Sequence, residues 1–310
     1  MLYSKHLTRP RTIKGKIMKK AKLFMDTVVE IEVISEKSTE DIERKINRAF
    51  DAFRNIEQTC SRFSTSSELM QVCRQAGTPV AISPFLYEPL FFALELAKLT
   101  DGLYDPTVGK SMEKAGFNRH YLTGTRIDSN ADDSVSYHDI TLDPVERTLT
   151  LNKPLVIDLG AVAKGFAIDL ATNELRDFEG FIVNAGGDIF AGGSDPNCNK
   201  WTIGIQHPYQ KDKIIDSIEI SNEAICTSGS YERKNSSSPQ EHHLIDPKTK
   251  HSLNDWVSCS VAAPFAMMAD GFSTAVFLQG FKSGRRFMED LELRGLLITP
   301  DLHVVRIGGV

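Results

Sequence analysis

Short β-type runs and amphipathic helical segments alternate irregularly along this 310-residue chain, and this pattern constrains the fold more than any other feature. Apolar or alternating runs predict strands over 22–34, 140–160, 180–193, 201–207, 216–229, 242–247, 257–263 and 301–308. Helical spacing predicts helices over 38–59, 84–102, 160–178, 264–280 and 283–300, with a polar loop over 116–139. No repeat and no linker divides the pattern. It favours a single α+β domain with mixed or antiparallel sheets and packed helices.

Composition and charge narrow the functional classes. A net charge of −5 argues against a general nucleic-acid binder, which normally carries a basic surface. The five cysteines are scattered without a CxxC pair, which predicts buried thiols in a reducing compartment. Residues 1–21 are basic without an apolar run behind them, so we expect a flexible extension before a domain over 22–310. Cytoplasmic residence without membrane insertion is the expectation.

Asp270 and Thr274 form the first candidate site. They are four residues apart in a predicted helix, so their side chains project from one face. A carboxylate and a hydroxyl one turn apart are oxygen ligands that suit Mg²⁺. A helix start, with the aspartate complementing the dipole and the threonine bonding a carbonyl, explains the same pair. By itself, the pair favours this structural explanation.

Two glycine-containing segments are weaker candidates. In 158–165, small residues precede a predicted helix, where an anion can approach the backbone and Lys164 adds a cation. A plain tight turn explains those glycines equally well. In 184–188, two glycines follow an apolar strand, which indicates a sharp turn or a close backbone approach. Neither segment has the spacing of a phosphate-binding loop or a dinucleotide fingerprint.

Three further segments carry polar side chains next to predicted turns. Residues 101–107 follow a helix C-cap. Tyr104 in this segment either packs against a planar ligand or occupies a gap at the protein surface. Residues 227–233 place hydroxyls beside a glycine, where they can bind phosphate or ribose oxygens. His242 and His243 precede a short strand, and because adjacent strand residues face opposite ways, at most one of them faces a given site.

The order of these segments resembles that of the ApbE family, the FAD:protein FMN transferases. The resemblance rests on eight segments between about residues 24 and 280: FMDTVVEIEV, SRFSTSSEL, TDGLYDPTVG, IDLGAVAKGFAID, VNAGGDI, CTSGSYER, HLIDPKT and VAAPFAMMADGFSTAVFLQG. It implies one α+β domain that holds FAD in a cleft with Mg²⁺ near the pyrophosphate.

The resemblance also implies roles for individual residues. It implies that Asp270, Thr274 and the carbonyl of Ala161 bind the metal, and that Asp270 or His243 accepts the proton of the attacking hydroxyl. The residues it places around FAD are Met25, Phe63, Leu103, Tyr104, Asp105, Lys164, Ser228 and Ile245.

The implied reaction moves FMN from FAD to a Ser or Thr hydroxyl of a target flavoprotein and releases AMP. A hydrolase that splits FAD with water and a flavin-storage protein are the alternatives. Two positions depart from the family pattern. Asp26 stands where Gly is usual, and either alters flavin affinity or marks a specialised branch, whereas Ala161 in place of Gly is a milder change.

Overall fold

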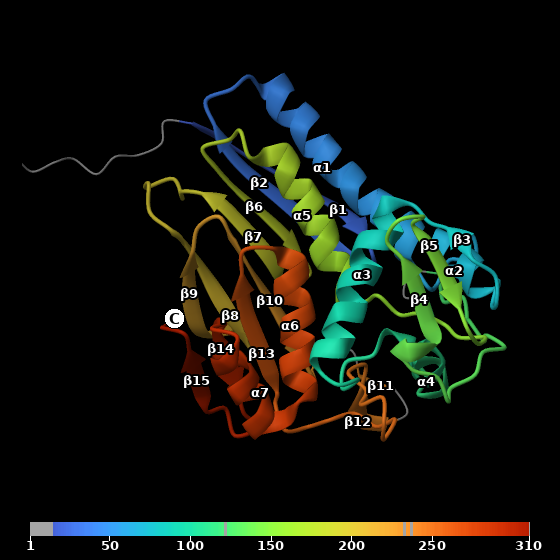
Figure 1. Cartoon of the computed structure of the whole chain (residues 1–310). Helices are drawn as coiled ribbons and strands as arrows, with labels where there is room; N and C mark the ends of the chain where they lie inside the picture. Colours follow the sequence, from blue (N-terminus) through green and yellow to red (C-terminus); the bar gives the residue numbers. More distant parts are fainter. Residues whose placement is uncertain (1–14, 121–122, 232–233, 236–237, 310) are drawn as a thin grey trace, which may run out of the picture.

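An eight-stranded antiparallel sheet forms the centre of the computed structural model, which describes residues 15–120, 123–231, 234–235 and 238–309 (Figure 1). Every neighbouring pair in this sheet is antiparallel. The strands in spatial order are β1 (Lys16–Phe24), β2 (Thr27–Ser35), β6 (Gly180–Ala185), β7 (Asp188–Gly193), β10 (Glu223–Gly229), β13 (Ser258–Ala263), β14 (Arg294–Ile298) and β15 (Val304–Ile307). The predicted α+β domain is confirmed, and its main sheet is antiparallel rather than mixed.

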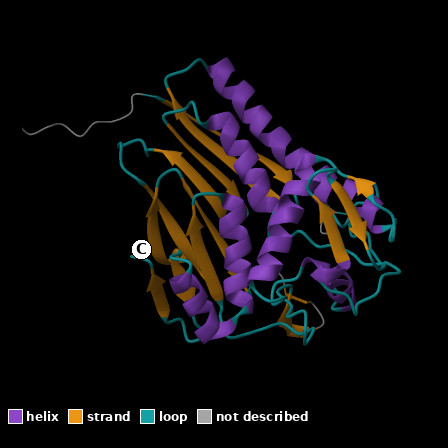
Figure 2. Ribbon diagram, viewed as in Figure 1, coloured by secondary structure: helices purple, strands orange, loops and turns teal. Residues whose placement is uncertain are grey.

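Helices cover one face of this sheet (Figures 1 and 2). They are α1 (Thr39–Cys60), α3 (Pro84–Leu99), α5 (Ala163–Leu175), α6 (Ala266–Leu278) and α7 (Gly280–Asp290). The predicted start of α1 is confirmed, because the Ser38 side chain accepts a hydrogen bond from the Asp41 N–H. The predicted apolar stripe of α1 is buried in the main core, which explains why this charged helix is stable here.

A long hairpin of β8 (Trp201–His207) and β9 (Gln210–Ile220) packs on residues of the opposite face of the sheet. Successive residues of one strand therefore enter different cores. In β2, Val33 belongs to the core under the helices, whereas Ile34 packs with the hairpin. All six residues of β13 are buried, because elements cover both faces of this strand. The residues of β13 are accordingly all small: serine, cysteine, valine and alanine.

Smaller elements surround one end of the helical layer. A three-stranded sheet contains β3 (Val80–Ala81), β5 (Thr148–Leu151) and β4 (Ile140–Asp143). The other small elements are α2 (Glu68–Cys73), α4 (Gly109–Lys114), β11 (Lys234–Asn235), β12 (Ser238–His242) and two short 3₁₀ turns over 106–108 and 137–139. The helix α2 was not predicted, because six residues are too few to show a helical repeat.

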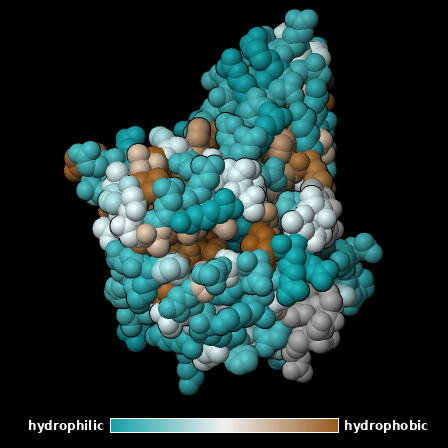
Figure 3. Space-filling model, turned by 90° about the vertical axis from the view of Figure 1, so that its right-hand side faces the viewer, coloured by the Kyte–Doolittle hydropathy of each residue, from teal (hydrophilic) through white to brown (hydrophobic). Residues whose placement is uncertain are grey.

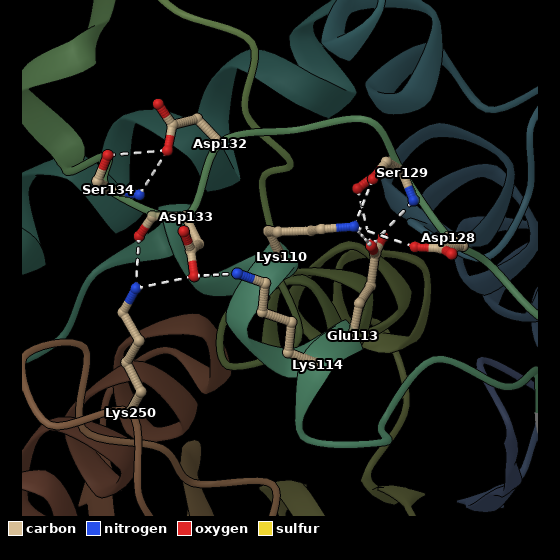
Figure 4. Close-up of polar contacts among 9 residues, drawn as sticks. All are labelled: Lys110, Glu113, Lys114, Asp128, Ser129, Asp132, Asp133, Ser134 and Lys250. Carbon is tan, nitrogen blue, oxygen red and sulfur yellow. Dashed lines mark hydrogen bonds and ion pairs between the residues drawn. The ribbon is translucent and has the colours of Figure 1, made fainter.

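An ion-pair network fixes the predicted polar loop over 116–139 (Figure 4). Lys110 of α4 contacts Glu113 and Asp128 at 3.1 and 3.0 Å, and Glu113 accepts hydrogen bonds from Ser129. Asp133 contacts Lys114 and lies 3.1 Å from Lys250. Charged side chains therefore attach this loop both to α4 and to the segment that follows β12.

Several predicted boundaries are wrong. The single strand over 22–34 is a hairpin of β1 and β2, so residues 16–21 of the expected extension belong to a strand. Residues 1–14 lie outside the described residues. The helix predicted over 283–300 ends at Asp290, and residues 294–298 form β14. The strand over 242–247 is limited to His242 at the end of β12 and an isolated bridge at Ile245.

The surface is largely polar. Figure 3 shows apolar side chains near the middle of one face, surrounded by hydrophilic ones. Cys60, Cys226 and Cys259 are buried as free thiols, but Cys198 is exposed, contrary to prediction. Within the described residues, no helix has the length and apolarity needed to cross a bilayer. Cytoplasmic residence remains a prediction.

Candidate functional site

Asp270 and Thr274 project from α6 into the junction of α6, α5 and β10. Their exposed fractions are 5% and 6%. The Asp270 carboxylate accepts a hydrogen bond of 3.0 Å from the Gly165 N–H at the start of α5. The Thr274 hydroxyl lies 2.9 Å from that of Ser228 on β10. The predicted metal pair is therefore a buried pair that faces two other elements, rather than a helix start, because α6 already begins at Ala266.

A lysine lies next to this carboxylate. The Lys164 Nζ is 3.7 Å from Asp270 and contacts Asp188 directly. Asp188 is buried on β7, and its other oxygen accepts the Thr227 N–H of β10 at 3.0 Å. This carboxylate orients Lys164 through a direct ion pair. Asp188 was part of a weak glycine motif in the sequence, and its role depends on the pairing of β7 with β10.

Tyr104 is buried in the main core, so it does not fill a surface gap. Its hydroxyl has no hydrogen-bond partner among the described residues. Burial raises the pKa of the Tyr104 phenol well above its usual value, and the charges of Asp158, Asp270 and Asp105 raise it further. The phenol therefore stays protonated, and its hydrogen is available to an acceptor such as a ligand oxygen.

Asp105 is engaged within the protein. One of its oxygens accepts hydrogen bonds from the N–H and the hydroxyl of Thr107, and the other accepts the Tyr137 N–H at 3.0 Å. Burial raises the pKa of this carboxyl. Leu103 beside it is half-buried. The observed role of Asp105 is to shape the turn that presents Tyr104.

Arg62 joins this region to the start of α5. Its Nε lies 2.5 Å from Asp158, which accepts the Gly160 N–H at 2.7 Å just before Ala161. The Arg62 guanidinium also lies over the Phe63 ring, 4.2 Å from its centroid. The position of Phe63 and the turn that contains Ala161 are thus coupled through one buried arginine, which the sequence analysis did not single out.

Met25 and Asp26 form the two-residue turn of the β1–β2 hairpin. Their φ angles are +51° and +60°, as expected for a type I′ turn, which favours glycine at both positions. Asp26 faces His120 at 3.7 Å, and His120 packs edge-on against Phe63 at 6.1 Å between ring centroids. His120 was not predicted as part of this group, because it lies in the polar loop.

The glycines of the two weaker motifs have separate explanations. Gly186 and Gly187 form the two-residue turn between β6 and β7 with φ angles of +65° and +99°, which confirms the sharp turn predicted for 184–188, and a Cβ at Gly186 would also lie 2.3 Å from the Thr27 hydroxyl. A Cβ at Gly165 would lie 2.3 Å from the Ala266 carbonyl oxygen. Gly165 is therefore required by the contact between α5 and α6.

The remaining predicted residues lie at the end of β12 and just after it. His242 is buried, its Nε2 lies 2.8 Å from the Leu253 carbonyl oxygen, and its ring packs edge-on against Phe277 of α6. His243 is half-buried, whereas Ile245 is buried and bridges Ser252. Of the two histidines, His242 is committed to the core, which leaves His243 as the candidate for chemistry.

The donor set of the junction fits a hard cation. Among the described residues, no three His, Cys, Asp or Glu side chains gather to hold a metal. The implied set is instead one carboxylate, one hydroxyl and one carbonyl, all oxygen donors, as Mg²⁺ prefers when waters or phosphates complete its shell. Lys164 is 3.7 Å from Asp270, beyond hydrogen-bond range, and does not saturate this carboxylate.

The fold and the site define an α+β protein in which two helix N-termini, a lysine and a buried carboxylate–hydroxyl pair meet above an antiparallel sheet. The profile of the ApbE family matches residues 25–297. This chain belongs to the ApbE family.

Named relatives and solved structures agree with this membership. The chain is 30% identical over 267 residues to a FAD:protein FMN transferase of Haemophilus influenzae, covering 81% of this chain and 75% of that protein. It is 29% identical over 255 residues to one of Chlamydia trachomatis, covering 79% and 78%. The crystal structure of an ApbE protein of Thermotoga maritima superposes with a TM-score of 0.84 at 26% identity, covering 94% and 97%.

Proposed function

We propose that this protein is a Mg²⁺-dependent FAD:protein FMN transferase that moves FMN from FAD to a Ser or Thr hydroxyl of a target flavoprotein and releases AMP. The observation that carries the proposal is the buried pair of Asp270 and Thr274 beside Lys164 at the start of α5. Two of its relatives carry the name FAD:protein FMN transferase, and this shared name supports the proposed reaction.

Asp270, Thr274 and the Ala161 carbonyl would hold Mg²⁺, which when bound neutralises phosphate oxygens and stabilises the charge of departing AMP. Lys164 adds positive charge next to these ligands, and Asp188 holds it in place. The positive end of the α5 dipole lies at the same place, although Asp270 and the Leu159 carbonyl already accept the Gly165 and Ala163 N–H groups. The metal, Lys164 and this helix end would thus each add positive potential at one point.

We infer that the residues around the proposed metal site bind the two ends of FAD. The flavin would contact Met25 and Phe63, and the other end of FAD would contact Leu103, Tyr104, Asp105 and Ile245. Tyr104 supports this assignment with a buried hydroxyl that needs an acceptor. Ser228 is hydrogen-bonded to Thr274 and would orient the Thr274 hydroxyl that is proposed to bind the metal. The proton of the acceptor hydroxyl would move to Asp270 or His243 as the O–P bond to the target forms and the bond to AMP breaks.

The test is to incubate the protein with FAD and Mg²⁺, with and without an acceptor domain that carries the Ser/Thr motif, and to separate the products. We expect AMP together with covalent flavin on the acceptor. Free FMN and AMP in both tubes would instead indicate a hydrolase, and intact FAD in both would indicate a flavin-binding protein.

The matched variant is Asp270→Asn. It keeps an oxygen that can accept the Gly165 N–H and removes the charge that holds the metal. We expect AMP release to fall by at least about 100-fold, in line with the loss of a metal ligand. Release at the wild-type rate under limiting Mg²⁺ would contradict the metal assignment.

A further inference from the structure

The helices α5 and α6 both begin without a capping side chain from their own N-cap residue. Val162 precedes α5 and Phe265 precedes α6, and within the described chain neither makes a side-chain capping bond. The first N–H groups of a helix have no partners inside the helix and require acceptors when they are buried. Both helix starts therefore depend on acceptors from elsewhere.

Each helix receives a side-chain acceptor from the other, and at α5 the Leu159 carbonyl oxygen also accepts the Ala163 N–H at 2.8 Å. Asp169 of α5 accepts the Ala266 N–H at 2.7 Å on one oxygen and the Met267 N–H at 2.9 Å on the other. In return, Asp270 of α6 accepts the Gly165 N–H of α5 at 3.0 Å. The two carboxylates thus cap the two helices reciprocally across one contact.

The backbones of α5 and α6 are in direct contact at this point, which restricts the movement of one helix relative to the other. A Cβ on Gly165 would lie 2.3 Å from the Ala266 carbonyl oxygen, so the helices touch where the carboxylates cross. Asp270 lies one turn after Ala266, and Lys164 lies beside Gly165. A shift of the first turn of α6 would therefore move Asp270 relative to Lys164 and to the turn that contains Ala161.

We propose that Asp169 is a positioning residue that holds the first turn of α6 in place, so that Asp270 and Thr274 face the start of α5 in the geometry needed to bind Mg²⁺. This inference rests on the proposed function. It assigns a role to a carboxylate that touches neither the metal nor the substrate. Residues that orient metal ligands typically contribute about 10- to 100-fold to metal affinity.

The variant that tests the proposal is Asp169→Asn. Its amide keeps the volume and one acceptor oxygen but places an N–H group toward one of the two backbone N–H donors of α6. Asp143→Asn is the control for an aspartate whose amide keeps its bonds. Asp143 accepts the Val145 and Glu146 N–H groups at 2.8 and 2.9 Å on a single oxygen, in the β4–β5 turn of the small sheet far from the proposed metal site.

Two measurements separate positioning from simple stabilisation. Mg²⁺ is titrated calorimetrically into each FAD-free protein, and AMP release from FAD is followed as Mg²⁺ is raised. For Asp169→Asn we expect the dissociation constant and the half-saturating Mg²⁺ concentration to rise about 10- to 100-fold, with the maximal rate restored at saturation. For Asp143→Asn we expect both to equal the wild-type values, and we expect the urea midpoint to fall in Asp169→Asn but to change little in Asp143→Asn.

Other outcomes are equally clear. If Asp169→Asn and Asp143→Asn require the same Mg²⁺ concentration, Asp169 is a structural cap only and the inference is wrong. If raising Mg²⁺ does not restore the rate of Asp169→Asn, the residue acts on something other than metal affinity, which also contradicts it. If Asp270→Asn binds Mg²⁺ like the wild type, the proposed metal site itself fails, which is a distinguishable result.

Discussion

At Tyr104, a phenol hydroxyl lies inside the protein without a partner among the described residues. Such a group weakens the folded state unless a ligand or water accepts its hydrogen. Burial raises the pKa of the phenol, and the charges of Asp158, Asp270 and Asp105 raise it further, so the phenol stays protonated. The residue is therefore suited to donate to an oxygen of a bound phosphate or sugar.

The Tyr104→Phe variant tests this role, because it removes only the hydroxyl. We expect its free energy of unfolding to stay the same or rise by about 1 kcal/mol, since an unpaired buried group is lost. Its affinity for FAD should fall about fivefold, the equivalent of one hydrogen bond of about 1 kcal/mol. Equal FAD affinities in a fluorescence titration would remove the hydroxyl from the site. Tyr104→Ala is unsuitable, because truncating a buried aromatic costs about 3–5 kcal/mol.

Asp26 permits a second test at the residue scale, because it is a non-glycine residue in the left-handed region at φ +60°. Asp26→Gly should change the free energy of unfolding by about 0 to +1 kcal/mol, as relief of backbone strain outweighs loss of the partly exposed pair with His120. Asp26→Val should cost about 1–2 kcal/mol, because a β-branched residue is disfavoured there. Urea unfolding measures both. A destabilised glycine variant would mean that the His120 contact dominates.

At the scale of elements, the crossing of α5 and α6 has a predictable pH dependence. Burial raises the pKa of Asp169 from 3.8 to about 6, opposed by its hydrogen bonds to Met267 and Ala266 and by the Arg176 charge. The nearby Asp270 carboxylate raises it slightly further. The folded protein therefore binds this proton more tightly than the unfolded chain, so the contribution of Asp169 to stability declines as pH rises from about 4 to 6.

The measurement compares unfolding free energies of the wild type and Asp169→Asn at about pH 4.5 and pH 7. The amide cannot titrate, so the variant should lose less stability than the wild type over this interval. At both pH values it also lacks one capping bond, which adds a constant cost of about 1 kcal/mol. Parallel pH curves for the two proteins would show that Asp169 has an ordinary pKa in the folded state.

At the scale of the whole molecule, ion pairs hold distant segments together without adding much to global stability. Asp133 joins α4 to the segment after β12 through Lys114 and Lys250, both of which are exposed (Figure 4). Exposed ion pairs typically contribute less than about 1 kcal/mol each. Their effect should be local order around the segment that carries His243 and Asp246.

We expect Asp133→Asn to change the free energy of unfolding by less than about 1 kcal/mol, yet to speed amide hydrogen exchange over 123–136 and 246–251. Asp128→Asn is the control, because the salt bridge of Asp128 within the described residues is to Lys110 on α4 and does not reach the segment after β12. That variant should speed exchange in the first segment alone. Lys250 also donates to the Asp133 backbone carbonyl at 2.9 Å, a bond that the variant keeps. Unchanged exchange over 246–251 in Asp133→Asn would therefore show that the Asp133 carboxylate does not restrain this segment.

Local sequence patterns were sufficient to predict the secondary structure wherever a helix or strand buries one of its faces. The apolar spacing and N-cap of α1, the largely buried α6 and the glycine turn after β6 are all present as predicted. Prediction failed where the same local pattern suits two structures. Residues 294–298 continue an apolar run after α7, and only pairing with β13 and β15 makes them a strand. The single strand predicted over 22–34 was wrong because neither Met25 nor Asp26 is glycine, the residue that such a two-residue turn favours.

The sequence by itself determined the α+β class, the positions of the chief helices and the membership of the ApbE family, because short-range periodicity and segment order are written along the chain. Only the tertiary structure decided which side chains share a site. Asp188 reaches Lys164, Arg62 reaches Asp158, and Asp169 caps α6. Each pair is far apart in sequence, and its contact depends on how packed elements cross, which no local pattern encodes.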